Sequence, residues 1–262
     1  MDKNAIEKAA RILREAEAAR QTCAPVRDIL GSDSDQALAY AVQDTNRTHW
    51  LGQGRRLIGR KVATSSAAAM KAFGIHGPSY GMLYHDMVLN DGAAIPAGRL
   101  CQPRLECEVA VVLEHDLTMA QPTLVDAWRA VGYLLPAIEV VDSRIANNDA
   151  RIVDLIADNT SGAFFVLGAM ARKPDGIDLR RATGVLYRNG QEAGRGTGVN
   201  VWGGPINALA WLAAKQAEIG LPLKAGDVVM TGTYCPMVPA EPGDEIRVEI
   251  EGLGVCEVSF PA

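Results

Sequence analysis

The sequence lacks the long hydrophobic runs and the excess of positive charge that mark several large classes of protein. No apolar run approaches the ~20 residues that a membrane-spanning helix needs. The first residues are polar and helix-like, without the apolar core of a signal peptide. A net charge of −5 and a pI of about 5.4 argue against nucleic acid or an anionic membrane as the main partner. We therefore expect a cytoplasmic enzyme.

Cysteine is scarce, and the signatures of several common active sites are missing. The five cysteines are odd in number and widely spaced, with no C-x-x-C pair, which argues against disulfides and against a zinc site. The four histidines show no H-E-x-x-H spacing, and no G-x-S-x-G elbow is present to hold a serine nucleophile. The glycine-containing stretch at 195–198 lacks the full G-x-G-x-x-G pattern, so we discount nucleotide binding.

The length and the hydrophobic pattern predict one large domain, or a domain with an appendage. Of the 262 residues, 48% are hydrophobic and 22% are charged, as is typical of a globular protein with a substantial core. Apolar residues recur at helical spacing over 2–23 and 34–50, whereas strand-like runs dominate afterwards without regular helical crossovers. We expect strands at about 57–64, 105–113, 134–142, 163–167, 183–188, 227–231 and 245–259, and helices at about 65–73, 123–131 and 204–218. The pattern therefore predicts an α+β fold, with a helical N-terminal region over 1–60 and a mixed, mainly β core with peripheral helices over 61–262.

Three glutamates interrupt apolar runs. Glu106 and Glu108 lie one residue apart in the run at 105–113, and Glu139 lies in the run at 134–141. Side chains on a strand alternate between its faces, so Glu106 and Glu108 point the same way, with Cα atoms roughly 7 Å apart. Because an unpaired buried charge is costly, one shared cation is favoured over solvated glutamates on an edge strand. Oxygen ligands favour a hard cation such as Mg²⁺, Mn²⁺ or Ca²⁺.

Other polar residues are candidates for substrate contacts. Lys61 follows a basic stretch with mostly apolar faces, so it is either a partly buried cation for proton transfer or carboxylate binding, or a surface lysine. Asp158, Asn159 and Ser161 directly precede a strand, where they can present polar groups to an anion or simply form a turn. Thr231 ends a strand beside a glycine, where backbone can approach a ligand or an ordinary loop can form.

A series of short motifs runs in a fixed order through nearly the whole chain. These are Pro25-Val26-Arg27-Asp28, Ala39-Tyr40-Ala41-Val42-Gln43, Gly54-Arg55-Arg56-Leu57-Ile58-Gly59-Arg60-Lys61, Tyr80-Gly81-Met82-Leu83, Pro103-Arg104-Leu105-Glu106-Cys107-Glu108, Pro136-Ala137-Ile138-Glu139-Val140-Val141-Asp142-Ser143-Arg144, Ala157-Asp158-Asn159 and Leu223-Lys224-Ala225-Gly226-Asp227. In this combination the chain resembles the hydratase/decarboxylase family of the fumarylacetoacetate hydrolase superfamily, and most closely its 2-hydroxypenta-2,4-dienoate (2-oxopent-4-enoate) hydratases.

The resemblance implies a fold, a cofactor and a reaction. It implies a fumarylacetoacetate hydrolase-like catalytic domain that assembles as a homo-oligomer, with Mg²⁺ or Mn²⁺ held by Glu106, Glu108 and Glu139. It also implies that Lys61 faces the substrate. The segments around Asp158 and Thr231 would lie near the same pocket. The expected substrate is a short 2-hydroxydienoate, which gains a proton at the far end of the diene and then water at C4. The product is a 4-hydroxy-2-oxoacid of aromatic catabolism.

The chain departs from the family pattern at one position that bears on the reaction. Related hydratases often read P-D-[FY]-G where this chain has Pro78-Ser79-Tyr80-Gly81, so Ser79 stands where an acid is expected. From this position we expect Ser79 to contact the substrate. Two alternatives therefore stay open. One is a 4-oxalocrotonate-type decarboxylase acting on a 2-oxo-enedioate, and the other is a non-catalytic subunit that supports a partner enzyme. A complex with a decarboxylase or aldolase of the same pathway is a further expectation.

Overall fold

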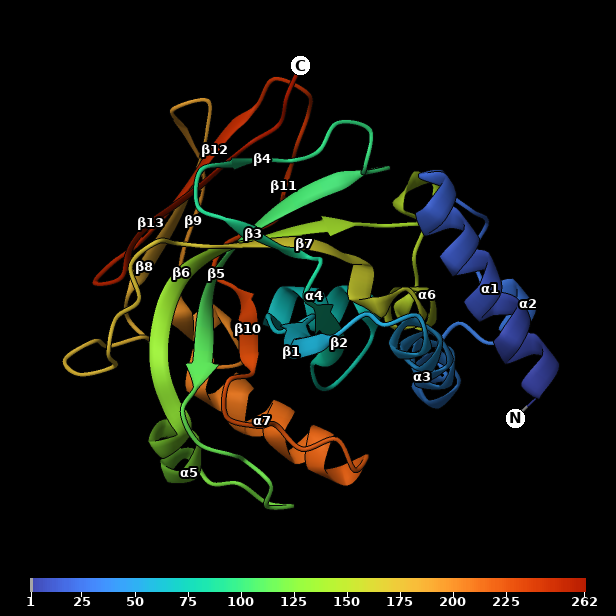
Figure 1. Ribbon diagram of the computed structural model, residues 1–262, viewed down its shortest axis with the longest axis horizontal. Coiled ribbons are helices and arrows are strands. Elements are labelled where there is room, and N and C mark those ends of the chain that lie inside the picture. The colour runs from blue at the N-terminus through green and yellow to red at the C-terminus, as the bar shows by residue number, and fades with distance from the viewer. Residues whose placement is uncertain (1) are drawn as a thin grey trace.

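Two β-sheets form the centre of the molecule. In the computed structural model, which describes residues 2–262, the larger sheet curves strongly and the smaller one packs against it (Figure 1). Along the larger sheet the strands follow the order β2 (Ser79–Tyr84), β1 (Leu57–Ala63), β10 (Val228–Thr233), β5 (Pro103–Leu113), β6 (Val131–Asp142), β7 (Gly162–Leu167) and β3 (Val88–Asn90), with β11 (Val238–Pro239) pairing β5. Along the smaller sheet the order is β4 (Ala93–Ala94), β13 (Gly254–Ser259), β12 (Glu245–Ile250), β8 (Thr183–Arg188) and β9 (Gln191–Thr197).

The main core lies between the sheets and beneath one long helix. Strand β12 shows why the sheets pack: Ile246, Val248 and Ile250 alternate with polar residues and are all buried. Strands β12 and β13 contact β6, and β8 contacts β5. On the larger sheet, helix α7 (Pro205–Glu218) covers β10 and β1, and the short helix α5 (Leu124–Ala130) packs beside α7 (Figure 1). Most residues of β5 and β6, the strands that carry the three glutamates, are buried.

The N-terminal helices form a second cluster at one end of the molecule. Helices α1 (Lys3–Ala19), α2 (Arg27–Leu30) and α3 (Gln36–Gly52) pack with α6 (Ile152–Ala157), and their apolar side chains make a separate hydrophobic cluster (Figure 1). Helix α3 begins where Asp35 accepts hydrogen bonds from the backbone N–H groups of Ala37 and Leu38. Helix α6 also contacts the 3₁₀ turn η2 (Asn159–Ser161), so this cluster reaches the polar segment that the sequence singled out before β7.

Most of the expected elements are present, and the α+β class is confirmed. Helix α4 (Ala67–Phe73) ends at Gly74 in the left-handed conformation. The run expected as one strand at 245–259 is a hairpin of two strands, because the chain turns at 251–253. Strand β2, at 79–84, is an element that the sequence did not predict. Short 3₁₀ turns complete the chain: η1 (Ala146–Asn148), η2 (Asn159–Ser161) and η3 (Gly198–Asn200).

Two expectations about organisation have different outcomes. Among residues 2–262, no helix is both long and apolar enough to cross a membrane. The division of the chain at residue 60 stays a prediction. Residue 60 itself lies within β1, which begins at Leu57, five residues after α3 ends at Gly52.

Candidate metal centre and substrate cavity

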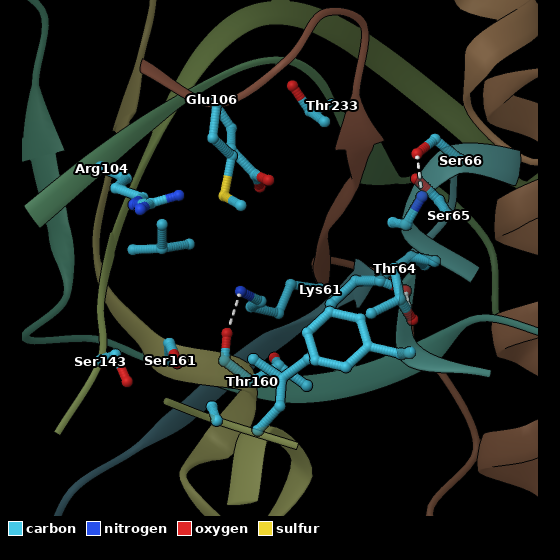
Figure 2. Close-up of a pocket in the computed structure, with 18 of the residues that line it drawn as sticks. Lys61, Thr64, Ser65, Ser66, Arg104, Glu106, Ser143, Thr160, Ser161 and Thr233 are labelled. Atoms are coloured by element: carbon cyan, nitrogen blue, oxygen red, sulfur yellow. Dashed lines mark hydrogen bonds between the residues drawn. The ribbon is translucent and has the colours of Figure 1, made fainter. Parts of the chain in front are cut away.

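A cavity of about 230 Å³ opens beside β1 and β5, between α4 and the 3₁₀ turn η2. Figure 2 shows Glu106 and Arg104 from β5 on one side of it, Lys61 and Thr160 on the other, and Ser65 and Ser66 at the start of α4. The lining also includes Thr64, Ser143, Ser161 and Thr233, together with the apolar side chains of Phe73, Val141, Leu155 and Met237. The space is that of a small-molecule site, and its lining combines these apolar side chains, here called the apolar wall, with charged and hydroxyl groups.

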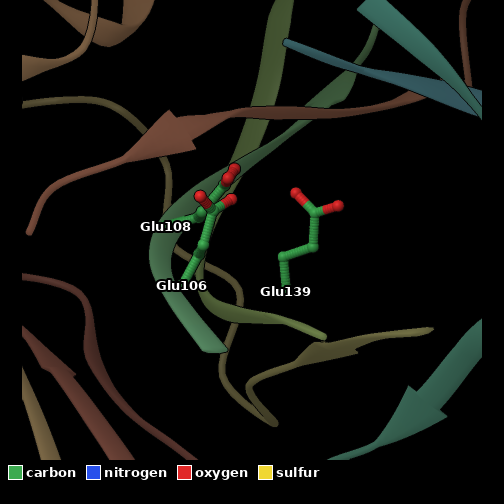
Figure 3. Close-up of side chains that lie close together, drawn as sticks. All are labelled: Glu106, Glu108 and Glu139. Atoms are coloured by element: carbon green, nitrogen blue, oxygen red, sulfur yellow. The ribbon is translucent and has the colours of Figure 1, made fainter. Parts of the chain in front are cut away.

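The three glutamates meet at this cavity. Strands β5 and β6 pair in a register that sets Glu106 directly opposite Glu139, and Glu108 follows two residues further along the same face of β5. Carboxylate oxygens of all three residues lie within 4.8 Å of one another (Figure 3). Glu108 and Glu139 are buried, and Glu106 is half-buried toward the cavity. The carboxylates thus converge, as their spacing predicted.

The charges and hydrogen bonds of this cluster fit a divalent cation. Glu108 Oε2 accepts a hydrogen bond from the N–H of Gly232 at 2.8 Å, but Glu108 Oε1 and Glu139 Oε2 are buried with no hydrogen-bond partner. Burial and the neighbouring Glu139 raise the pKa of Glu106 to about 7, and burial raises the pKa of Glu108 well above its usual range. Orphaned carboxylate oxygens and costly negative charge are what a hard cation would satisfy, since Mg²⁺ and Mn²⁺ bind oxygen ligands.

Lys61 lies inside the same cluster. It is only 1% exposed, forms an ion pair with Glu139, and donates a hydrogen bond from Nζ to the carbonyl oxygen of Thr160 at 2.9 Å. The side chain lines the cavity (Figure 2). Of the two readings that the sequence left open for Lys61, the buried cation is therefore correct and the surface lysine is wrong.

The carbonyl that holds Lys61 comes close because Gly81 has no side chain. Gly81 pairs with Lys61 across β1 and β2, and a Cβ atom on Gly81 would lie 2.5 Å from Thr160 Oγ1 and 2.8 Å from the carbonyl oxygen of Asn159. Asn159 also fixes η2 to β2, because its side-chain amide accepts from the N–H of Met82 at 2.7 Å and donates to the Met82 carbonyl at 2.9 Å. The small Gly81 and the Asn159 hydrogen bonds thus hold the Thr160 carbonyl within hydrogen-bond distance of Lys61 Nζ.

Four of the residues expected to bind substrate are engaged elsewhere. Asp158 is held by Arg144 in a buried ion pair at 2.6 Å, and Asn159 binds the backbone of β2 as described. Thr231 donates its hydroxyl to the carbonyl of Val109. Ser79 is 1% exposed, and its hydroxyl lies 3.1 Å from Thr64 Oγ1. None of these four lines the cavity, whereas Ser161 does.

The sequence did not single out several groups that line the cavity. They include Arg104 and Thr64, whereas Thr160 and Thr233 lie in the segments around Asp158 and Thr231 that the sequence did single out. A signal existed for Arg104, because it precedes Glu106 by two residues on the same strand and therefore shares its face. No local signal existed for Thr64, whose position at the cavity depends on tertiary packing.

Comparisons with known proteins agree with this architecture. The family model "Fumarylacetoacetate (FAA) hydrolase C-terminal" matches residues 58–260, and the chain belongs to the fumarylacetoacetate hydrolase family. Within it, the chain is similar to enzymes named 2-keto-4-pentenoate hydratase. It is 45% identical to 2-keto-4-pentenoate hydratase 2 of Dechloromonas aromatica, over 97% of both chains. It is 43% identical to the 2-keto-4-pentenoate hydratase of Paraburkholderia phymatum, over 99% of this chain and 98% of that one.

A solved structure extends the similarity to a neighbouring activity. The 4-oxalocrotonate decarboxylase of Pseudomonas putida G7, complexed with magnesium and adipate, superposes with a TM-score of 0.94 at 30% identity. The match covers 99% of this chain and 98% of that one. The fumarylpyruvate hydrolase of Pseudomonas aeruginosa, at 18% identity and a TM-score of 0.62, shares the fold alone.

Proposed function

We propose that the protein is a metal-dependent hydro-lyase that adds water to a 2-hydroxy-2,4-dienoate of the 2-oxopent-4-enoate type, giving a 4-hydroxy-2-oxoacid in aromatic catabolism. The observation that carries this proposal is the convergence of three carboxylates beside a buried lysine at a small cavity. The similarity to named 2-keto-4-pentenoate hydratases over nearly the full chain supports this reaction.

Glu106, Glu108 and Glu139 would hold the cation, Mg²⁺ or Mn²⁺. When bound, it would supply positive charge that stabilises an oxyanion on a 2-oxoacid. Lys61 is the group proposed for proton transfer or for orienting the substrate. Its side chain lines the cavity, and its ammonium is held in place by the ion pair with Glu139 and the hydrogen bond to the Thr160 carbonyl. The apolar wall would exclude bulk water from the diene.

The residues around this centre take different proposed roles. Ser161 lines the cavity and is proposed to contact substrate. For Ser79, Asp158, Asn159 and Thr231 we now propose positioning roles, because their side chains hold Thr64, Arg144, β2 and β5 rather than facing the cavity. A homo-oligomer and a complex with a pathway decarboxylase or aldolase are retained as proposals.

Decarboxylation of a 2-oxo-enedioate is the second candidate. It is favoured by one observation, the similarity over the full chain to the decarboxylase of Pseudomonas putida G7. Both reactions use an enolate-like species, so the carboxylate cluster alone does not distinguish them.

The deciding experiment supplies the purified protein with Mg²⁺ and 2-hydroxypenta-2,4-dienoate. The expected result is loss of the dienol ultraviolet absorbance with formation of a 4-hydroxy-2-oxoacid, and chelation of the metal should stop it. Release of CO₂ from 2-oxohex-3-enedioate, with no hydration of the dienoate, would instead identify a decarboxylase. Full hydration after thorough chelation would contradict the metal assignment.

Metal affinity should depend on pH in a defined direction. Burial raises the pKa of Glu106 to about 7, so at pH 6 the cation must displace a proton that is mostly absent at pH 8. One such proton makes the apparent affinity about tenfold weaker at pH 6 than at pH 8, and the raised pKa of Glu108 steepens the trend. Calorimetric titration with Mn²⁺ across this range measures it. An affinity that does not change between the two pH values would contradict the assignment of Glu106 as a ligand.

A further inference from the structure

Arg104 is a charged residue of the cavity wall that the rest of the protein leaves uncommitted. It is half-buried on β5, on the face that it shares with Glu106, and Figure 2 shows its guanidinium directed into the cavity. Within the part of the chain that the structure describes, no hydrogen bond, ion pair or aromatic contact engages its side chain. The residues beside it on the neighbouring strands are Val141 and Pro239, neither of which can accept a hydrogen bond through its side chain.

The buried arginines differ from Arg104, because their side chains have partners within the protein. Arg60 donates to the side-chain carbonyl of Gln216 at 2.8 Å, and Arg144 forms its ion pair with Asp158. A guanidinium carries five N–H donors in a planar fork that matches a carboxylate. The Arg104 guanidinium, which has no protein partner and lines a small cavity, can therefore bind an anionic ligand.

The charges of the site give the number of anionic groups that it can take. Only Lys61, Arg104 and Glu106 are charged among the lining residues, and Glu108 and Glu139 complete the carboxylate cluster. Three carboxylates and two cations leave one negative charge, which a divalent cation would convert to one positive charge. Because Lys61 is already bound to Glu139 and Thr160, Arg104 is the group left to face a ligand carboxylate.

The rest of the lining offers no second cation for another carboxylate, because its other polar side chains are neutral hydroxyls and amides. Phe73 and Leu155 line the cavity from α4 and α6, and Val141 lies beside Arg104. A second carboxylate buried against these side chains would lose its hydration without gaining a cation. The wall suits an alkyl or alkenyl tail.

We propose that Arg104 is a specificity-determining residue that binds the single carboxylate of the substrate and restricts the site to monoanions. The inference rests on the proposed function for the identity of the ligand, a 2-oxoacid or its dienol. It assigns to Arg104 the contact that selects the charge of that ligand, and to the apolar wall the rejection of dicarboxylates.

Binding of inert ligands tests this assignment without turnover. Calorimetry in Mg²⁺ should compare 2-oxopentanoate with 2-oxoglutarate, which have the same carbon chain and differ in a terminal methyl or carboxylate. The wild-type protein should bind 2-oxopentanoate at least about tenfold more tightly. In Arg104→Met its affinity should fall about ten- to a hundredfold, the range expected for lost charge-assisted hydrogen bonds. Binding of the uncharged 2-oxopentanamide should not change.

Matched variants separate this effect from general loss of charge or fold. Arg104→Lys keeps the positive charge and should recover part of the affinity. Arg181→Met removes a cation whose side chain is 88% exposed, and it should leave binding unchanged. Equal binding of 2-oxopentanoate by Arg104→Met and wild type, or equal affinity of the wild type for the two acids, would overturn the proposal. If Arg104 behaves as expected but the dienoate is not hydrated, the proposed reaction fails and the role of Arg104 stands.

Discussion

Glu108→Gln is expected to abolish metal-dependent turnover while leaving the fold intact. The amide oxygen can still accept the hydrogen bond from Gly232, but the substitution removes one of the three negative charges that would hold the cation. Loss of a ligand should weaken metal affinity and lower kcat/KM by at least about a hundredfold, by analogy with losses at other charge-stabilising groups. The metal-free variant should be at least as stable as wild type. Burial raises the pKa of Glu108, so the wild-type carboxylate must either be buried with its charge or take up a proton on folding, and glutamine avoids both costs.

A surface glutamate provides the control. Glu114 is exposed and pairs with Lys173 at 3.0 Å, so Glu114→Gln should leave metal affinity and turnover unchanged. The measurements are calorimetric metal affinity, the rate of dienol loss and thermal unfolding with and without Mg²⁺. Mg²⁺ at a hundred times its Kd should stabilise wild type by about 2.7 kcal/mol and Glu108→Gln by much less. Full activity in Glu108→Gln would remove Glu108 from the metal centre.

The carboxylate cluster was predictable because it depends on two short-range rules. Alternation along a strand puts Glu106 and Glu108 on one face, and the cost of burying charge argues that Glu139 must share their partner. The register that sets Glu139 opposite Glu106 is a long-range property that the spacing alone does not specify, because a slip of one residue would turn Glu139 to the other face.

The substrate side of the site was less predictable, because its polar residues have competing partners in the fold. Asp158 looked like an anion-facing residue, yet Arg144 lies close enough in the fold to bind it. The Asn159 side chain makes two hydrogen bonds to the backbone of Met82 in β2, a strand that the sequence did not predict. Gly81 carries no side-chain signal at all, although its lack of a Cβ atom lets Thr160 approach Lys61. The local sequence pattern identifies polar residues before a strand, but it does not identify the residues with which they form hydrogen bonds or ion pairs in the fold.

Ser79 has a more specific consequence for the mechanism. Its hydroxyl and backbone N–H both meet Thr64 Oγ1, at 3.1 Å and 3.0 Å, and Thr64 in turn lines the cavity. The position at which related hydratases carry an acid therefore reaches the cavity here only through a neutral hydroxyl. Among the lining residues, Lys61 and Glu106 then carry the side chains that could transfer a proton, so we expect the chemistry to depend on the lysine and its carboxylate neighbours.

Lys61→Met is expected to lower both activity and stability, and the stability loss should depend on metal. Removing the ammonium leaves Glu139 without its cation beside Glu106 and Glu108, and breaking a buried ion pair from one side typically costs about 3–5 kcal/mol. In urea unfolding at pH 8 with a chelator, the variant should lose stability in this range. Turnover should fall by about 10²- to 10⁴-fold, the usual contribution of a proton-transfer group.

Three controls separate the electrostatic explanation from lost packing. Mg²⁺ should restore much of the lost stability of Lys61→Met, because it returns positive charge to the three carboxylates. Lowering the pH to about 5.5 should also shrink the deficit: burial raises the folded-state pKa of Glu106 to about 7, so the proton that neutralises it below that pH relieves the repulsion. Lys173→Met, at the exposed pair with Glu114, should leave the stability close to that of wild type. A deficit in Lys61→Met that stays the same with Mg²⁺ and at both pH values would mean that Lys61 acts through packing and not through its charge.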